Sequence, residues 1–139
     1  AYWLRGKALS AQATERIHVG SVLAAPDFHA VVDVCAEYPM AHMPSYYTTV
    51  PMLDMVPADV AALRAAADAL HQMLQQQNQP VLVCCALGYS RSVAVVLVYL
   101  LRQGHAHDLQ AALKLLQTAR PVMVVSPANQ LQILKAAHE

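Results

Sequence analysis

The chain has 139 residues, enough for one domain that buries about two-thirds of the surface its unfolded form would expose. Its nine basic and nine acidic residues cancel and only 13% of residues are charged, which argues against a nucleic-acid groove or an anionic membrane surface as partner. We therefore expect a single domain over residues 1–139 in which any bound anion is held by a local arrangement of groups.

The first half of the chain predicts three strands and one helix. Short β-branched runs at Arg16–Val19 and Val31–Val34 indicate strands, and Tyr46–Val50 is a third candidate. From Pro57 to about Gln77 the apolar residues recur at helical spacing. The residues that share one face of this helix are Leu63, Ala67, Leu70 and Leu74.

The second half predicts a buried strand followed by helices. Val81–Cys84 is a continuous apolar run, typical of a central strand covered on both faces. Val93–Leu101 is apolar all round, as a core helix must be, and Gly104 should end it. This run is about half the length that a bilayer requires, so we do not expect it to span a membrane.

Two further helices are expected near the end of the chain. One covers Asp108–Ala119, and the other opens at Ser126-Pro127 and carries Leu131 and Leu134. Leu109, Leu113 and Leu116 are expected to point inward. The predicted order is strands in the first part of the chain, then a strand that leads directly into a helix, then further helices. This order predicts a small layered α/β domain with its site at the carboxyl end of the central strand.

The segment after the central strand has the pattern of a phosphate-binding loop. Cys85 stands five positions before Arg91, Gly88 lies within the loop, and Ser92 follows it. Helix N-terminal N–H groups favour both a thiolate and a bound phosphate, and the arginine fork can hold two phosphate oxygens. The predicted roles are nucleophile for Cys85, phosphate ligand for Arg91 and hydrogen-bond donor to the sulfur for Ser92. Phosphate would also contact the loop at Ala86, Leu87, Gly88, Tyr89 and Ser90.

Phosphoryl transfer to sulfur also needs an acid that protonates the leaving oxygen. Among nine carboxylates, Asp54 stands out because it lies on a loop between two prolines that restrict its motion. Asp33 lies within a predicted strand, and Asp59 falls on a helix with a surface or capping role. Position alone leaves Asp54 as a candidate without deciding the matter.

The segment Cys85-Ala-Leu-Gly-Tyr-Ser-Arg91-Ser92, together with Pro51-Met-Leu-Asp54 and Arg120-Pro121, resembles the dual-specificity branch of the cysteine-dependent protein phosphatases. The likeness extends from about Ile17 to Leu134 and is strongest to bacterial members of this branch of the protein tyrosine phosphatase superfamily, some of which are fused behind a membrane-embedded lipid phosphatase. It implies a five-stranded, mostly parallel sheet flanked by helices. It also implies a phosphocysteine on Cys85, with Asp54 as general acid and then base.

The resemblance implies a phosphomonoester hydrolase that acts on phosphotyrosine, with phosphoserine and phosphothreonine left open, and on proteins or small phosphomonoesters. It implies no cofactor. A singly phosphorylated lipid is the alternative substrate, since the variable loop positions carry no positive charge. The seven histidines form no recognisable zinc set, so no metal is expected.

One departure from the family concerns the residue before the nucleophile, where histidine is usual and this chain has Cys84. We predict a working but less activated Cys85, to be tested by its rate of alkylation against pH. Strand alternation points Cys84 away from the side of Cys85, into the core. Cys35 is expected to serve packing, with a resolving role toward oxidised Cys85 as the alternative. Tyr46 and Tyr47 either line the mouth of the site or pack against the sheet.

Two functions of other classes remain open on the residues alone. A sulfur-transfer enzyme also uses a loop cysteine but would be indifferent to Asp54→Asn, and a non-catalytic phosphate-binding module would not need cysteine, arginine and acid together. Three cysteines, two of them adjacent, favour a reducing compartment, so a cytoplasmic location is expected. Because the sequence starts at Ala1, we expect a processed protein or a domain excised from a longer chain, and a membrane-embedded fusion partner upstream stays open.

Overall fold

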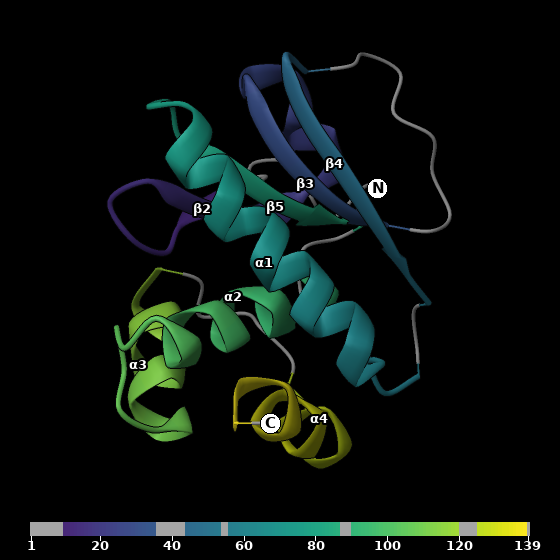
Figure 1. The fold of residues 1–139 in the computed structure, drawn as a ribbon, viewed down its shortest axis with the longest axis vertical. Helices are drawn as coiled ribbons and strands as arrows, with labels where there is room; N and C mark the ends of the chain where they lie inside the picture. The colour runs from purple at the N-terminus through teal and green to yellow at the C-terminus, as the bar shows by residue number, and fades with distance from the viewer. Residues whose placement is uncertain (1–9, 36–43, 54–55, 87–89, 120–124, 139) are drawn as a thin grey trace.

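The fold is a five-stranded sheet with α-helices packed against one of its faces (Figure 1). The computed structural model describes residues 10–35, 44–53, 56–86, 90–119 and 125–138. The strands are β1 (Ser10–Gln12), β2 (Ile17–Ser21), β3 (Ala30–Cys35), β4 (Tyr46–Met52) and β5 (Val81–Cys85). The helices are the 3₁₀ helix η2 (Val22–Asp27) and the α-helices α1 (Val60–Gln76), α2 (Arg91–Arg102), α3 (Leu109–Ala119) and α4 (Pro127–His138).

Strand β5 occupies the centre of the sheet. The order is β1-β2-β5-β3-β4, and β5 pairs in parallel with β2 on one side and with β3 on the other. Strand β4 continues the parallel part beyond β3, while the short β1 runs antiparallel to β2 at the opposite edge. The predicted α/β fold with a mostly parallel sheet flanked by helices is confirmed. Because the parallel strands end at a common edge, the segment after β5 leaves the sheet beside the ends of β2 and β3.

The two faces of the sheet are covered differently. One face packs against α1 and α2, on which α3 and α4 pack in turn, and Val81, Val83 and Cys85 of β5 contribute to this main hydrophobic core. The other face packs against η2 in a smaller cluster that contains Leu82 and Cys84. The strand alternation therefore sends Cys85 and Cys84 to opposite faces, and the predicted burial of Cys84 in core is confirmed.

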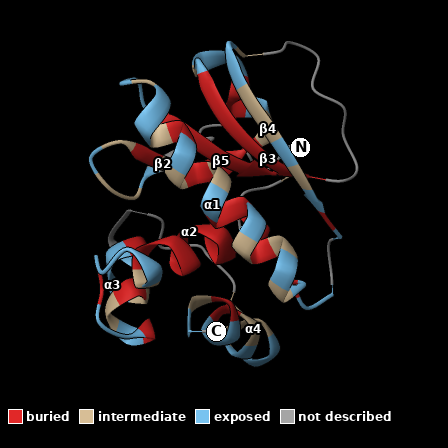
Figure 2. Ribbon diagram, viewed as in Figure 1, coloured by how far each residue is buried: buried red, intermediate tan, exposed pale blue. Residues whose placement is uncertain are grey.

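Helix α2 is buried around its whole circumference, as the red ribbon in Figure 2 shows. Every residue from Arg91 to Leu100 is buried, so the apolar run predicted its environment correctly. Gly104 follows the helix with a φ of 77°, a left-handed conformation that glycine adopts without steric cost, and the predicted stop is confirmed. In the described part of the chain, no helix combines the length and the apolar character needed to cross a bilayer.

The boundaries of the helices differ from the prediction in one instructive place. Helix α1 begins at Val60 rather than at Pro57, because the Asp59 carboxylate accepts a hydrogen bond of 3.0 Å from the N–H of Ala62 and caps the helix. Asp59 thus has the capping role expected for it. The 3₁₀ helix η2 was not predicted, since its Pro26 marks a turn in the sequence.

Helix α4 buries a different pair of residues from the leucines that the sequence draws attention to. Ile133 and Ala136 are buried, whereas Leu131 is 55% exposed and Leu134 is 36% exposed. The same helix contacts both α1 and α2, so it packs against the two helices that cover the sheet. Apolar residues on the outer side of α4 therefore contribute surface rather than core.

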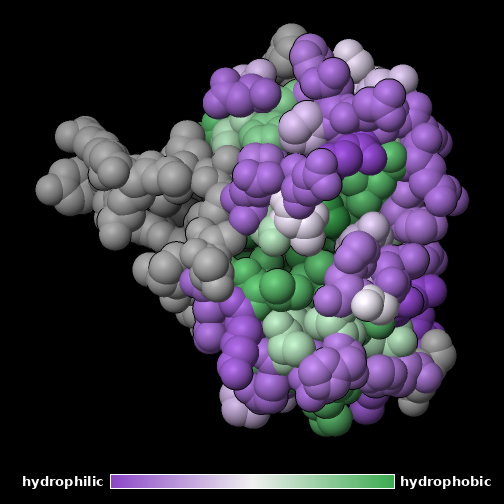
Figure 3. All heavy atoms as spheres, turned by 90° about the vertical axis from the view of Figure 1, so that its left-hand side faces the viewer, coloured by the Kyte–Doolittle hydropathy of each residue, from purple (hydrophilic) through white to green (hydrophobic). Residues whose placement is uncertain are grey.

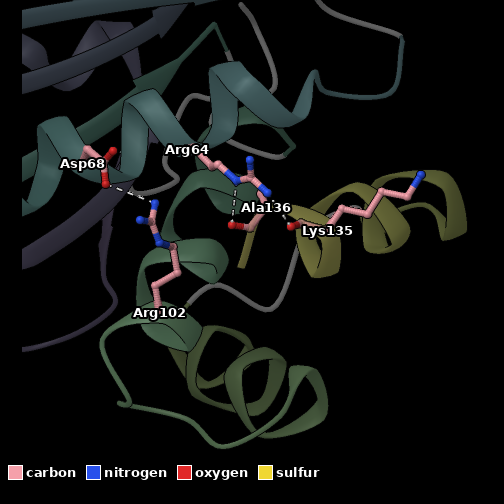
Figure 4. Close-up of polar contacts among 5 residues, drawn as sticks. All are labelled: Arg64, Asp68, Arg102, Lys135 and Ala136. Atoms are coloured by element: carbon pink, nitrogen blue, oxygen red, sulfur yellow. Dashed lines mark hydrogen bonds and ion pairs between the residues drawn. The ribbon is translucent and has the colours of Figure 1, made fainter. Parts of the chain in front are cut away.

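Polar contacts of two arginines tie the helices together (Figure 4). The Arg64 side chain of α1 donates hydrogen bonds to the main-chain oxygens of Ala136 (3.3 Å) and Lys135 (3.1 Å), near the end of α4. A cation at this position stabilises the carbonyl end of the helix. Arg102 at the end of α2 forms an ion pair of 3.0 Å with Asp68 of α1.

The surface seen from the side of β2 and α3 mixes polar and apolar groups (Figure 3). Green apolar surface lies in a hollow between purple polar side chains, and Leu115 of α3 is 43% exposed. Arg16, which directly precedes β2, donates hydrogen bonds to the main-chain oxygens of Leu74 (2.8 Å) and Gln79 (3.2 Å) and so caps the end of α1. These contacts hold the helical layer against the sheet.

Candidate active site

Cys85 ends the central strand with its sulfur against the first turn of α2. Its side chain is 3% exposed, and the thiol donates a hydrogen bond to the hydroxyl of Ser92, with 3.4 Å between Sγ and Oγ. A thiolate has no proton to give, so the Ser92 hydroxyl must become the donor once the sulfur ionises. The structure therefore brings together two of the residues that the sequence singled out, although seven positions separate them.

Arg91 opens α2 and is also buried, at 5% exposed. Its Nη1 atom donates a hydrogen bond of 2.9 Å to the main-chain oxygen of Met52 at the end of β4. A buried guanidinium is costly to leave without partners, and this carbonyl supplies one. The Arg91 side chain thus joins the start of α2 to the end of β4, the strand that leads to Asp54.

The N-terminus of α2 has no side-chain cap from Ser90. Ser90 occupies the N-cap position, and its main-chain oxygen accepts the first helical hydrogen bond, from Ala94 at 2.9 Å, but its hydroxyl makes no cap hydrogen bond. The first N–H groups of a helix have no partners within the helix, and they attract anions. A helix N-terminus that Ser90 does not cap, beside Cys85, is chemically suited to bind an anion.

Ser21 is a site residue that sequence reasoning missed. It ends β2 beside β5, is fully buried, and donates a hydrogen bond of 2.7 Å to the main-chain oxygen of Ala86, the first residue after Cys85. Its hydroxyl also accepts a hydrogen bond of 3.1 Å from the N–H of Leu23. Ser21 therefore fixes the point where the chain leaves β5. The only signal in the sequence was a polar residue at the end of an apolar strand.

Asp33 forms a second polar group at the same edge of the sheet. It is 2% exposed, and its two carboxylate oxygens accept hydrogen bonds from the N–H of Cys35 (2.9 Å) and the hydroxyl of Tyr47 (2.8 Å). Burial, followed by the hydrogen bond and the negative charge of Asp33, raises the pKa of Tyr47 to about 12. Tyr47 accordingly packs against the sheet, while Tyr46 is 40% exposed.

The other two cysteines are buried near this edge. Cys84 is fully buried on the η2 face, and burial, followed by the charge of Asp33, raises its pKa well above the usual range of a thiol. Cys84 is therefore held as a neutral packing residue. Cys35 ends β3, the strand next to β5, and is 5% exposed. A role in packing is consistent with this burial.

Several predicted site residues lie outside the described residues. They are Asp54, Leu87, Gly88 and Tyr89. The described residues that flank Asp54 along the chain are Leu53 and Val56, and those that flank residues 87–89 are Ala86 and Ser90. The arrangement that the structure does describe, a buried cysteine, a hydroxyl, an arginine and a helix N-terminus, suits nucleophilic attack on a bound anion.

Comparison with known proteins agrees with this chemistry. A family model described as the catalytic domain of dual specificity phosphatases matches residues 12–139. Among solved structures, a mouse protein assigned to the dual specificity phosphatases and complexed with zinc tungstate has a TM-score of 0.81 at 25% identity, covering 96% of this chain and 89% of that chain. Human DUSP28 has a TM-score of 0.81 at 26% identity, covering 94% and 93%. PTPMT1, solved in complex with PI(5)P, shares the fold with a TM-score of 0.74 at 16% identity, covering 94% and 95%. A search of curated protein sequences finds no match.

Proposed function

This chain belongs to the dual-specificity phosphatase family, and from that premise we propose that it hydrolyses phosphate monoesters on proteins through a phosphocysteine on Cys85. The observation that carries the proposal is the contact of 3.4 Å between Cys85 Sγ and Ser92 Oγ at the start of α2. A nucleophile at this place is supported by the helix N-terminus and by Arg91. We assign the whole of residues 1–139 to one phosphatase domain.

In the first step, the Cys85 thiolate attacks the phosphorus atom in line with the leaving oxygen. Arg91 and the N–H groups of residues 86–90 hold the three equatorial oxygens, where phosphoryl-transfer enzymes concentrate their stabilisation. Asp54 gives its proton to the leaving oxygen as the bond to phosphorus breaks.

In the second step, water attacks the phosphocysteine and the sulfur leaves as a thiolate. Asp54, now ionised, takes the proton from the water, and the Ser92 hydroxyl donates a hydrogen bond to the departing sulfur. The buried contact between Ser92 and Cys85 supports this role, because a hydroxyl already in place loses little freedom when it becomes the donor.

The proposed substrates are phosphotyrosine proteins, with phosphoserine and phosphothreonine as further candidates. A singly phosphorylated lipid is the second candidate, since the structural neighbour PTPMT1 was solved with PI(5)P. The loop positions Ala86, Leu87, Tyr89 and Ser90 carry no positive charge, which disfavours multiply phosphorylated inositides.

The test compares hydrolysis of an aryl phosphate and a phosphotyrosine peptide by wild type, Cys85→Ser and Asp54→Ala. We expect Cys85→Ser to lose turnover while it still binds phosphate, and Asp54→Ala to lose most of its kcat. Asp27→Ala, an exposed carboxylate at the end of η2, is the matched control and should keep full activity. No hydrolysis of either phosphate ester by wild type, together with a persulfide on Cys85 whose transfer is unaffected by Asp54→Asn, would instead favour a sulfur-transfer enzyme.

A further inference from the structure

An apolar pocket lies next to the proposed phosphate site, between the end of β4 and the start of α1. Its volume is about 300 Å³. The residues that line it are Pro51, Met52, Leu53, Val56, Pro57, Ala58, Asp59 and Ala62. Leu53 is 70% exposed and Val56 is 51% exposed, so two large apolar side chains within four positions face solvent at this place. Exposed apolar surface that gathers in a hollow is a common mark of a binding site.

Arg91 connects this pocket to the proposed phosphate site. Met52 belongs to the pocket lining, and its main-chain oxygen accepts the hydrogen bond of 2.9 Å from Arg91. A phosphate held by Arg91 would therefore lie near the end of β4, where the pocket begins. A substrate group that enters the pocket must belong to the part of the molecule close to its phosphate.

The far wall of the pocket is held in place by α4. The N–H of Ala58 donates a hydrogen bond of 2.9 Å to the side-chain oxygen of Asn129, and the oxygen of Ala58 accepts one of 3.0 Å from Gln132. Both main-chain groups of Ala58 are thus fixed by side chains of one helix. A wall that is already ordered costs little entropy when a ligand binds.

The charge of the pocket disfavours an acidic occupant. None of the described lining residues is a cation, and the one carboxylate, Asp59, already accepts the capping hydrogen bond from Ala62. An acidic side chain would lose its water there without gaining a partner, whereas an apolar side chain would gain from burial. The volume is at the small end for ligand sites, which suits one side chain better than an enclosed acyl chain.

We infer that this pocket is a specificity subsite for an apolar side chain that flanks the phosphorylated residue of a peptide substrate. The inference rests on the proposed function, because the pocket can act as a subsite only if Arg91 holds the phosphate of the substrate. Leu53 and Val56 supply the contact surface, and Ala58 with its partners on α4 supplies the fixed wall.

The experiment uses phosphotyrosine peptides that carry leucine, alanine or aspartate at each position flanking the phosphotyrosine in turn. The measured quantity is the ratio of kcat/KM for the best leucine peptide to that for its aspartate counterpart, within one variant, so that a general change in activity cancels. We expect a ratio of roughly 10 or more in wild type, as burial of one apolar group allows. Leu53→Ser and Val56→Ser should each lower the ratio severalfold. Leu115→Ser, an equally bulky exposed leucine on α3, should leave the ratio unchanged.

Each outcome decides between the two ideas. A ratio near one in wild type, with the peptides still hydrolysed, overturns the subsite and leaves the proposed function in place. If a micellar lipid with one phosphate is hydrolysed faster than every peptide, and Leu53→Ser reduces that rate, the occupant is a lipid chain and the peptide inference is wrong. If neither aryl phosphate nor any peptide is hydrolysed, the proposed function itself fails.

Discussion

The Arg91 side chain donates a hydrogen bond of 2.9 Å to the main-chain oxygen of Met52, and this contact joins the start of α2 to the end of β4. Arg91 is the proposed phosphate ligand, and Met52 stands two positions before Asp54, the proposed acid. One guanidinium therefore contacts the strand that leads to the acid and borders the loop that would hold the phosphate. A guanidinium carries N–H donors on more than one edge of its plane, so Arg91 can bind the Met52 carbonyl and a phosphate at the same time.

We expect Arg91→Lys to reduce kcat/KM for an aryl phosphate by roughly a hundredfold or more. Lysine keeps the charge but offers one point of contact, so it cannot bind two phosphate oxygens and the Met52 carbonyl together. Arg102→Lys, on the surface end of the same helix, is the control and should retain wild-type kinetics. Equal activity of Arg91→Lys and wild type would show that the arginine fork does not bind the phosphate.

Ser92→Ala should slow the second chemical step more than the first. The hydroxyl lies 3.4 Å from Cys85 Sγ, and the sulfur needs a donor most when it leaves as a thiolate. Stopped-flow measurement of aryl alcohol release should then show a burst that approaches the enzyme concentration, followed by a slow steady rate. A variant without any burst, whose kcat and kcat/KM fall equally, would contradict this assignment of the hydroxyl to the second step.

Ser21→Ala should lower both stability and activity. It removes the hydrogen bond of 2.7 Å that the buried Ser21 hydroxyl donates to the main-chain oxygen of the half-buried Ala86, and the loss of such a hydrogen bond costs about 0.5–1.5 kcal/mol of unfolding free energy. Urea unfolding followed by fluorescence measures the loss, and the exposed Ser45→Ala is the control. We also expect a lower kcat, since Ala86 begins the phosphate loop. A change in unfolding free energy below about 0.5 kcal/mol would mean that the hydrogen bond from Ser21 to Ala86 contributes little to stability.

The sequence predicted the parts of this fold that depend on local pattern. The central strand and α2 are apolar runs whose length and stop signal are visible in the chain, and the alternation along β5 assigned Cys84 and Cys85 to opposite faces. Cys85 and Ser92, which the sequence pattern assigned to one site, are also in direct contact in the structure. These features need no knowledge of distant partners.

The contacts that sequence reasoning missed join positions far apart in the chain. Ser21 contacts Ala86 only because β2 lies beside β5, which brings together residues 65 positions apart. Asp33 was correctly placed in a strand, but its role depends on Tyr47 across the pairing of β3 with β4. The same applies to Asn129, whose partner Ala58 is 71 positions away. A single sequence has no local signal for such pairs.

Cys35 offers a test of oxidation chemistry near the nucleophile. Peroxide converts the Cys85 thiolate to a sulfenic acid with release of hydroxide, and a second thiol can then displace water to form a disulfide. Cys35 ends the strand adjacent to β5 and is the candidate for that thiol. If it acts so, Cys35→Ser should recover less activity after peroxide and reductant than wild type, because sulfenic acid left unprotected oxidises further. The same recovery in both proteins would leave Cys35 with packing alone.

Tyr47 gives the fold a defined response to alkaline pH. Burial and the neighbouring Asp33 raise its pKa from 10.0 to about 12 in the folded protein. A raised pKa means that the folded state holds the proton more tightly, so this stabilisation is complete below pH 10 and is lost as the pH rises through about 12. Tyr47→Phe has no proton to lose and also leaves one Asp33 oxygen without its donor.

The measurement is the difference in unfolding free energy between wild type and Tyr47→Phe across this pH range, from urea titrations. We expect wild type to be the more stable protein at pH 8 to 10, and its advantage to shrink between pH 10 and 12 as the tyrosine of the unfolded chain ionises first. Other tyrosines and lysines titrate in both proteins and cancel in the difference. A constant difference over the whole range would mean that the Tyr47 hydroxyl keeps an ordinary pKa in the fold.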